Sequence, residues 1–174
     1  MPLTPATDAD LLVLHGQLGR EPRGVLAVAA RCACGNPVVV RTAPRLPEGT
    51  PFPTQYYLTH PGAVSAVSTL EATGTMREMQ DRLLDDAGLA AAYRAAHESY
   101  LEERYELGDV PEIHGISAGG MPDRVKCLHV LVGHSLAAGP GVNPLGDEAL
   151  ALIRDRWRVD RCTCDSPGAA GPRG

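Results

Sequence analysis

The sequence feature that most constrains the fold is the confinement of strand-like composition to the first third of the chain. Residues 25–31 and 38–42 are apolar and rich in valine, and the turn-forming segment Cys34-Gly35-Asn36-Pro37 lies between them. A further run with strand composition, Gln55 to Thr59, follows a proline-rich loop. We therefore predict a small antiparallel sheet within about residues 25–60.

Helical signals dominate the rest of the sequence. Thr7 and Asp10 have the spacing of a capping box at the start of a short helix that Gly19 ends. Further helix starts are marked by Pro61, Thr75, Asp86, Pro122 and Asn143. The helix that begins at Pro122 is expected to run to about Ala138. These features predict an α+β fold in which the sheet packs against a mainly helical C-terminal portion.

Length and charge restrict the class of protein. Of the 174 residues, 44% are hydrophobic, so we expect one globular domain over residues 1–165 and a disordered tail over residues 166–174. The formal net charge of −5 argues against nucleic-acid binding, which requires a basic surface. We find no membrane-spanning run and no cationic leader, and therefore expect no membrane association and a cytoplasmic location.

Five cysteines in such a chain indicate reduced thiols, a metal site or a reactive cysteine rather than a disulfide framework. The two Cys-x-Cys pairs, Cys32/Cys34 and Cys162/Cys164, could together supply four thiolates to a tetrahedral zinc ion. However, the one-residue spacing is shorter than that of a usual zinc knuckle, and the second pair borders the expected tail. We expect the purified protein to hold little or no zinc, the alternative being a zinc site that uses Cys32 and Cys34.

A second group, Cys127, His129 and His134, falls in the helix predicted to begin at Pro122. Successive residues of a helix are rotated by about 100°, so Cys127 and His129 would point to nearly opposite sides. Cys127 and His134 would share a face but lie about 10.5 Å apart along the axis, too far to hold one metal ion. We expect at most one ligand from this helix, completed elsewhere by Cys32, Cys34 or His60.

The glycine-rich loop Gly115 to Pro122 leads directly into the same predicted helix. Free N–H groups at a helix N-terminus attract anions, and cations in the first turns would oppose the helix dipole unless an anion offset them. We expect a phosphorylated or other anionic small molecule to bind there, with His129 and Lys126, the chain's one lysine, as catalytic residues. Its ligand-binding residues would be Ser117, Gly119, Gly120, Arg124 and Lys126.

Three segments also resemble a known bacterial family. They are residues 51–59, residues 119–129 and residues 139–148. They make the chain similar to domain-of-unknown-function family 501 over roughly residues 18–157. The resemblance carries no assigned activity. Through gene neighbours that encode a septum-forming protein, enolase and an exopolyphosphatase, it implies a phosphate-linked or division-linked role.

Two functions therefore compete. One is a small enzyme or sensor for an anionic small molecule, and the other is a non-catalytic, zinc-stabilised module that binds a protein partner in cell division. A concave pocket where the glycine-rich loop, Lys126, His129 and Arg45 converge would favour the first. An exposed apolar patch around Tyr56, Tyr57 and Trp157 would favour the second.

Overall fold

The computed structural model describes residues 3–164, so the predicted tail over residues 166–174 lies outside the described residues. Four strands form one sheet in the order β1 (Thr4–Pro5), β2 (Val25–Arg31), β3 (Pro37–Thr42) and β4 (Tyr56–Leu58). All neighbouring strands are antiparallel. The helices are α1 (Asp8–Leu18), α2 (Pro61–Glu71), α3 (Thr75–Asp85), α4 (Ala87–Tyr105), α5 (Leu128–Ala138) and α6 (Pro144–Leu152), with a 3-10 turn at Pro111–Ile113. The predicted α+β class is confirmed.

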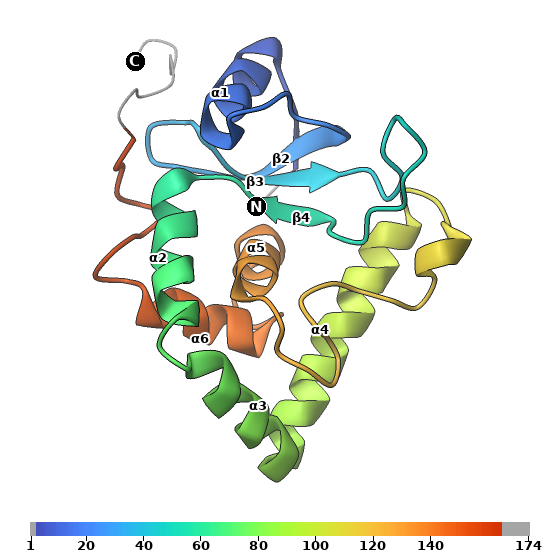
Figure 1. Ribbon diagram of the computed structural model, residues 1–174, viewed down its shortest axis with the longest axis vertical. Helices are drawn as coiled ribbons and strands as arrows, with labels where there is room; N and C mark the ends of the chain where they lie inside the picture. Colours follow the sequence, from blue (N-terminus) through green and yellow to red (C-terminus); the bar gives the residue numbers. More distant parts are fainter. Residues whose placement is uncertain (1–2, 165–174) are drawn as a thin grey trace.

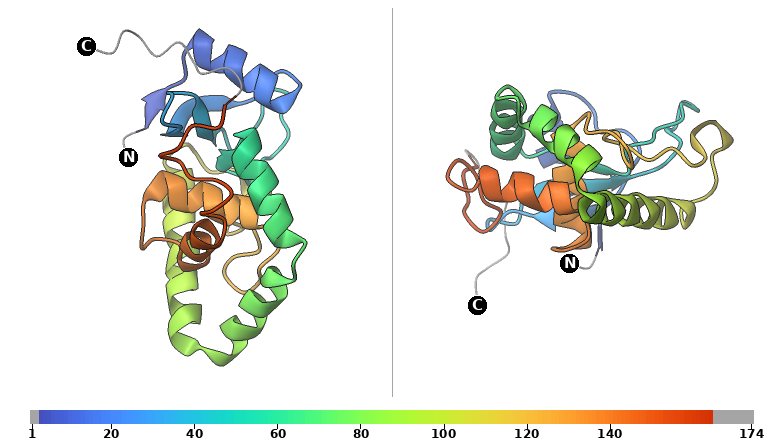
Figure 2. Two further views of the ribbon diagram at one scale, coloured as in Figure 1. Left: turned by 90° about the vertical axis from the view of Figure 1, so that its left-hand side faces the viewer. Right: turned by 90° about the horizontal axis from the view of Figure 1, so that it is seen from below.

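The sheet separates α1 from the other helices (Figure 1). Helix α1 lies on one side of the sheet, and α2, α4, α5 and α6 lie on the other, with α3 joining α2 to α4 at the far end of the molecule (Figures 1 and 2). Helix α5 packs on β4 and is itself packed against α6. None of the helices within residues 3–164 is long and apolar enough to cross a membrane.

The predicted local signals explain how the N-terminal part folds. Thr7 and Asp10 form the expected capping box of α1, and Gly19 ends this helix in the left-handed conformation. The β2–β3 hairpin closes through a hydrogen bond of 2.9 Å from the Cys32 N–H to the Asn36 carbonyl. Strand β1 was not predicted. It is only two residues long and pairs Thr4 with Val28 at the edge of the sheet.

The core lies between the sheet and the C-terminal helices. Along α4, Tyr93, Ala96 and Tyr100 are fully buried, as their three- and four-residue spacing predicts. The Tyr100 ring packs edge-on against Tyr56, with 6.0 Å between ring centroids, and against His134, with 5.1 Å. Two tyrosines and one histidine thus pack together where α4, α5 and β4 meet.

The prediction that α5 begins at Pro122 is wrong, because the helix begins at Leu128. Gly119 and Gly120 take left-handed φ angles of 71° and 97°, which turn the chain back on itself. The Arg124 N–H then donates to the Gly120 carbonyl, but this helical turn does not continue, because the Lys126 N–H reaches back to the Gly119 carbonyl. The glycine-rich loop therefore ends in an extended segment rather than in a helix N-terminus.

Candidate functional site

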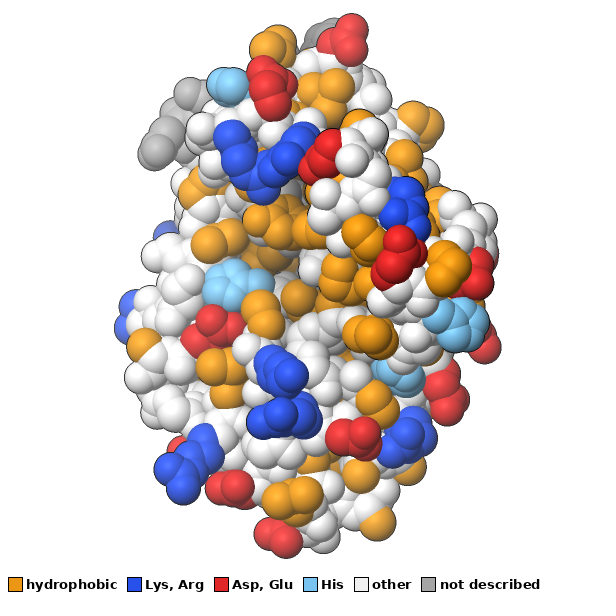
Figure 3. Space-filling model, turned by 45° about the vertical axis from the view of Figure 1, so that its right-hand side comes forward, with side chains coloured by type: hydrophobic (Ala, Val, Ile, Leu, Met, Phe, Trp, Pro, Cys, Tyr) orange, Lys and Arg blue, Asp and Glu red, His pale blue; other side chains and the backbone are white. Residues whose placement is uncertain are grey.

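A cavity of about 610 Å³ opens between β4, α2 and the start of α5. This volume is in the range of small-molecule sites. Figure 3 shows a hollowed, largely hydrophobic surface on this side of the molecule, bordered by a histidine. The lining combines apolar and hydroxyl side chains, among them Leu18, Leu58, Val64, Val130, Tyr57, Thr54, Thr59 and Ser65, together with Cys127 and His129.

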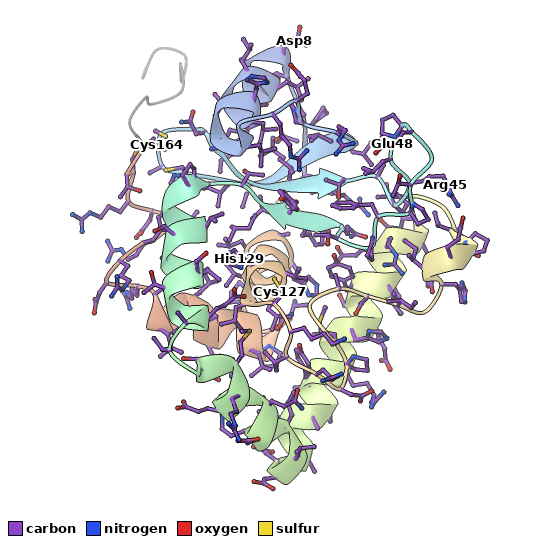
Figure 4. All side chains as sticks on the ribbon, viewed as in Figure 1. Asp8, Arg45, Glu48, Cys127, His129 and Cys164 are labelled. Atoms are coloured by element: carbon purple, nitrogen blue, oxygen red, sulfur yellow. The ribbon has the colours of Figure 1, made fainter. Side chains whose placement is uncertain are left out.

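Cys127 and His129 lie next to each other where α5 begins (Figure 4). Cys127 is the N-cap residue, with extended backbone angles of φ −156° and ψ 109°, and its Sγ lies 3.9 Å from His129 Nδ1. The conclusion from helix geometry that these two side chains diverge is therefore wrong, because Cys127 precedes the helix. His134 is fully buried, faces Tyr56 and Tyr100, and belongs to neither group of possible metal ligands found among residues 3–164.

Glu71, the last residue of α2, completes this group. One of its carboxylate oxygens, Oε1, lies 3.2 Å from His129 Nδ1 and also accepts a hydrogen bond of 2.7 Å from the Leu128 N–H. A single carboxylate thus caps the first turn of α5 and faces the imidazole. The sequence analysis did not include Glu71, because no local motif links it to residues 57 positions away.

The protonation of His129 follows from its neighbours. Its Nε2 lies 3.3 Å from the Val64 carbonyl, which can only accept, so Nε2 carries a proton. Ser68 Oγ lies 3.2 Å from the same nitrogen. The pKa of His129 is raised to about 9, mainly by the hydrogen bond with the Cys127 sulfur and further by the Glu71 carboxylate, while desolvation opposes the shift. At neutral pH a positive imidazolium therefore faces the Cys127 sulfur.

Two kinds of chemistry suit this arrangement. A thiol beside an imidazole, which is itself held by a carboxylate and a carbonyl, is typical of a nucleophilic cysteine. The same residues also offer sulfur, nitrogen and oxygen ligand atoms within 4.8 Å of one another. With the His129 Nε2–H bound to a backbone carbonyl, this set resembles a three-ligand catalytic metal site that leaves a position for substrate.

The residues predicted around the glycine-rich loop do not converge on this cavity. Buried Ser117 is hydrogen bonded to His97 Nδ1 at 2.8 Å and to the Met121 carbonyl at 3.3 Å. Arg45 pairs with Glu112 at 2.6 Å, on a loop remote from His129 (Figure 4).

Gly119 and Gly120 shape the turn, and a side chain at Gly120 would lie 2.5 Å from the Arg124 carbonyl oxygen. Arg124 and Lys126 are exposed. Within the described chain, His129 alone of the predicted site residues lines the cavity. The anion-binding roles of the other residues stay predictions.

The two Cys-x-Cys pairs meet in space, although they lie at opposite ends of the chain. The sulfur atoms of Cys32, Cys34, Cys162 and Cys164 all lie within 4.8 Å of one another, which is compatible with a zinc site. His60 Nε2 lies 3.2 Å from Cys164 Sγ. The second pair is thus as much a part of the group as the predicted ligands Cys32 and Cys34.

The apolar patch that would favour an interaction module is not exposed at the predicted residues. Tyr56 and Trp157 are each only 3% exposed, and Tyr57 is half-buried beside the cavity. A protein partner in cell division stays a prediction.

Together, the fold and the cavity define an α+β protein with a thiol and an imidazole in the wall of a cavity of small-molecule size and a carboxylate against the imidazole. The family model described as "Protein of unknown function (DUF501)" matches residues 28–151, and the chain belongs to this family. The matched range includes Glu71, Cys127 and His129. A search of curated proteins and a search of solved structures each found no match.

Proposed function

We propose that the protein is a cysteine-dependent enzyme that transfers the acyl group of a small, partly apolar substrate bound in the cavity. The observation that carries this proposal is the 3.9 Å contact between Cys127 Sγ and His129 Nδ1 at the end of the cavity, with the Glu71 carboxylate on the same nitrogen. The mixed apolar and hydroxyl lining suits a substrate with both hydrocarbon and hydrogen-bonding parts.

In this proposal the reactive resting state is a thiolate–imidazolium pair, in which His129 Nδ1 holds the proton of the Cys127 thiol and the Glu71 carboxylate stabilises the imidazolium. The Nε2–H bond to the Val64 carbonyl holds the ring in place. The thiolate attacks the substrate carbonyl carbon and forms a C–S bond, and the leaving group departs with the proton from Nδ1. A water molecule deprotonated by the neutral Nδ1 then cleaves the thioester, which releases the acid and restores the thiolate–imidazolium pair.

We further propose that the substrate is anionic. Exposed Arg124 and Lys126 place positive charge on the segment that leads to Cys127, and neither forms an ion pair with any residue in the described range 3–164. We then expect the Lys126→Ala variant to bind an anionic substrate more weakly than the wild type at low salt. The rate of the chemical step should stay the same. Equal Michaelis constants for the wild type and Lys126→Ala would contradict this part of the proposal.

The central test is the rate at which iodoacetamide alkylates Cys127 at pH 7, located by mass spectrometry of the intact, folded protein. We expect His129→Asn to slow alkylation of Cys127 at least tenfold, because the neighbouring imidazolium that favours the thiolate is lost. His114→Asn, which changes an exposed histidine paired with Asp109, is the matched control and should leave the rate unchanged. Equal rates in all three proteins would contradict a reactive thiol.

Acyl transfer itself is tested with a panel of activated acyl esters of different chain length. We expect a burst of product and a Cys127-bound acyl group, both absent in Cys127→Ser.

A second candidate function, a metal-dependent hydrolase, is favoured by the ligand geometry of Glu71, Cys127 and His129. If the protein is a metal-dependent hydrolase, we expect a chelator to abolish turnover and to speed the alkylation of Cys127.

A further inference from the structure

The cysteine cluster Cys32, Cys34, Cys162 and Cys164 lies apart from the cavity, where the β2–β3 hairpin meets the segment that follows α6. Figure 4 shows Cys164 beside the end of the sheet, distant from Cys127 and His129. We propose that these four cysteines bind one structural zinc ion that fastens the C-terminal segment to the hairpin.

The sulfur positions fit a tetrahedral zinc ion. With Zn–S bonds of about 2.3 Å, the sulfurs of a tetrahedral site lie about 3.8 Å apart. Cys164 Sγ lies 3.5 Å from Cys34 Sγ and 3.9 Å from Cys32 Sγ. Both separations are well beyond the roughly 2.05 Å of a disulfide bond. The cluster therefore has the dimensions of a tetrathiolate site.

The backbone on both sides holds the sulfurs in place. In the hairpin, Gly35 adopts a left-handed φ of 92° and donates a hydrogen bond of 2.8 Å to the Cys32 carbonyl. In the C-terminal segment, the Cys164 N–H points at Cys162 Sγ at 3.5 Å. The Ala33 N–H donates to the Val159 carbonyl at 3.1 Å and joins the two segments directly. The short Cys-x-Cys spacing is compatible with this site because Cys32 and Cys34 lie in the hairpin turn and the Cys164 N–H is directed at Cys162 Sγ.

His60 supplies a further group that favours a thiolate. Its Nδ1 accepts hydrogen bonds from the Gly62 and Ala63 N–H groups at the start of α2, so the ring proton must be on Nε2. That Nε2–H points at Cys164 Sγ, 3.2 Å away, from a side chain that is 1% exposed. Such outer hydrogen bonds stabilise thiolate ligands and orient them toward the metal.

Local charge is also suited to this site. Four thiolates with one Zn²⁺ carry a net charge of −2, which must be offset nearby. Residues 154–161, immediately before Cys162, contain four arginines and two aspartates and therefore contribute two positive charges. The chain segment next to Cys162 thus carries charge opposite to that of a tetrathiolate zinc site, and the His60 hydrogen bond also suits such a site.

The proposed zinc site would also secure one wall of the cavity. Trp157, the chain's one tryptophan, is buried against His60 with 5.6 Å between ring centroids. A side chain at Gly62 in α2 would lie 2.9 Å from Thr163 Oγ1 and 3.1 Å from Trp157 Cδ1. The C-terminal segment therefore packs tightly over the start of α2, the helix that supplies Val64 and Ser65 to the cavity and Glu71 to His129.

The test uses the full chain purified from zinc-containing medium without added chelator. We expect one zinc per chain by elemental analysis, and four sulfur neighbours at about 2.3 Å by X-ray absorption spectroscopy. Removing the metal with a strong chelator should shift the Trp157 fluorescence to longer wavelength, because the segment that carries this residue is released. This experiment needs no variant that could fail to fold.

Variants then assign the ligands. Cys164→Ser should lose at least nine-tenths of the bound zinc, whereas Cys127→Ser, which changes the one cysteine outside the cluster, should keep one zinc per chain. His60→Gln should weaken zinc binding by 10- to 100-fold without changing the number of sulfur neighbours.

Three results would overturn the proposal. They are the absence of zinc together with four reactive thiols or a disulfide, a zinc ion with nitrogen or oxygen neighbours, and loss of zinc in Cys127→Ser. The third would place the metal at Glu71, Cys127 and His129 instead and would favour the metal-dependent hydrolase. The first two leave the acyl-transfer proposal undecided, because that proposal rests on the reactivity of Cys127.

Discussion

At the scale of single residues, the protons of His129, His60 and His134 are placed by neighbours that can only donate or only accept. The Val64 carbonyl places a proton on His129 Nε2, and two backbone N–H groups leave His60 protonated at Nε2. In His134, Nδ1 faces Asn143 Nδ2, whose own amide oxygen accepts from the Gly146 N–H. In each ring these neighbours therefore fix which nitrogen carries the proton. Both proposed sites depend on this, because His129 Nδ1 faces Cys127 and His60 Nε2 faces Cys164.

Asp10 allows a quantitative prediction at this scale. Its side chain is 9% exposed, and its two oxygens lie 2.6 Å and 3.0 Å from the Arg31 guanidinium nitrogens. The pKa of Asp10 is lowered to about 2, mainly by this hydrogen-bonded pair and further by Thr7, while desolvation opposes the shift. Because the folded-state pKa lies below the unfolded value, the stabilisation is present above about pH 4 and is lost as the pH falls through about 2.

We expect Asp10→Asn to lower the free energy of unfolding by about 1–2 kcal/mol at pH 7, measured by urea denaturation. The difference from wild type should shrink steadily between pH 4 and pH 2. Asp8→Asn, in the same first turn of α1 but exposed, should change stability by no more than about 0.5 kcal/mol. A difference for Asp10→Asn that stays constant with pH would show that its charge is not the cause.

At the scale of elements, the sequence predicted the helices and strands whose ends are set by local signals. It missed the helix start that is set by a contact with a distant residue. The capping box predicted α1, the turn residues predicted the β2–β3 hairpin, and the residue spacing predicted the buried face of α4. The start of α5 was misplaced because Pro122 is a good helix-start residue, whereas the cap of this helix is the Glu71 carboxylate from another element. That error also separated Cys127 from His129, so at most one of the two was expected to contribute to a metal site.

The crossing of α5 and α6 gives the prediction for this scale. A Cβ atom at Gly146 would lie 2.2 Å from the Leu131 carbonyl oxygen and 2.4 Å from Ser135 Oγ, so the two helices would have to separate. We expect Gly146→Ala to lower the free energy of unfolding by about 1–3 kcal/mol. Gly16→Ala, inside α1 with no atom within 4 Å of the new methyl group, should instead raise it by about 0.5–1 kcal/mol. Urea denaturation of both variants measures the contrast, and equal effects would contradict close packing at Gly146.

At the scale of the whole molecule, both proposed sites are assembled from segments far apart in the sequence. Cys32 and Cys164 are 132 positions apart, and Glu71 is 57 positions from Leu128. The sequence could name most of the chemically active residues, since cysteines and histidines are few. It could not show which of them meet, because only the packing of α2 against α5 and of the C-terminal segment against the hairpin determines this. The sheet and α5 thus act as the frame to which both groups are attached.

The whole molecule should be most stable near pH 6.5, because two histidines shift in opposite directions. Burial lowers the pKa of His134 to about 4, with Asp147 opposing the shift, so stability falls as the pH drops from 6.5 to 4. The pKa of His129 is raised to about 9 by Cys127 and Glu71, so its stabilisation is lost as the pH rises from 6.5 to 9. Each group contributes a slope of at most about 1.4 kcal/mol per pH unit.

Urea denaturation between pH 4 and pH 9 tests this profile. We expect His134→Phe to flatten the acid side, although His60 and His97, whose pKa values are also lowered by burial, leave a residual slope there. We expect His129→Asn to flatten the alkaline side and leave the acid side unchanged. If the two variants both kept the wild-type profile, the shifted groups would have to be other residues, and the imidazolium proposed beside Cys127 would lose its support.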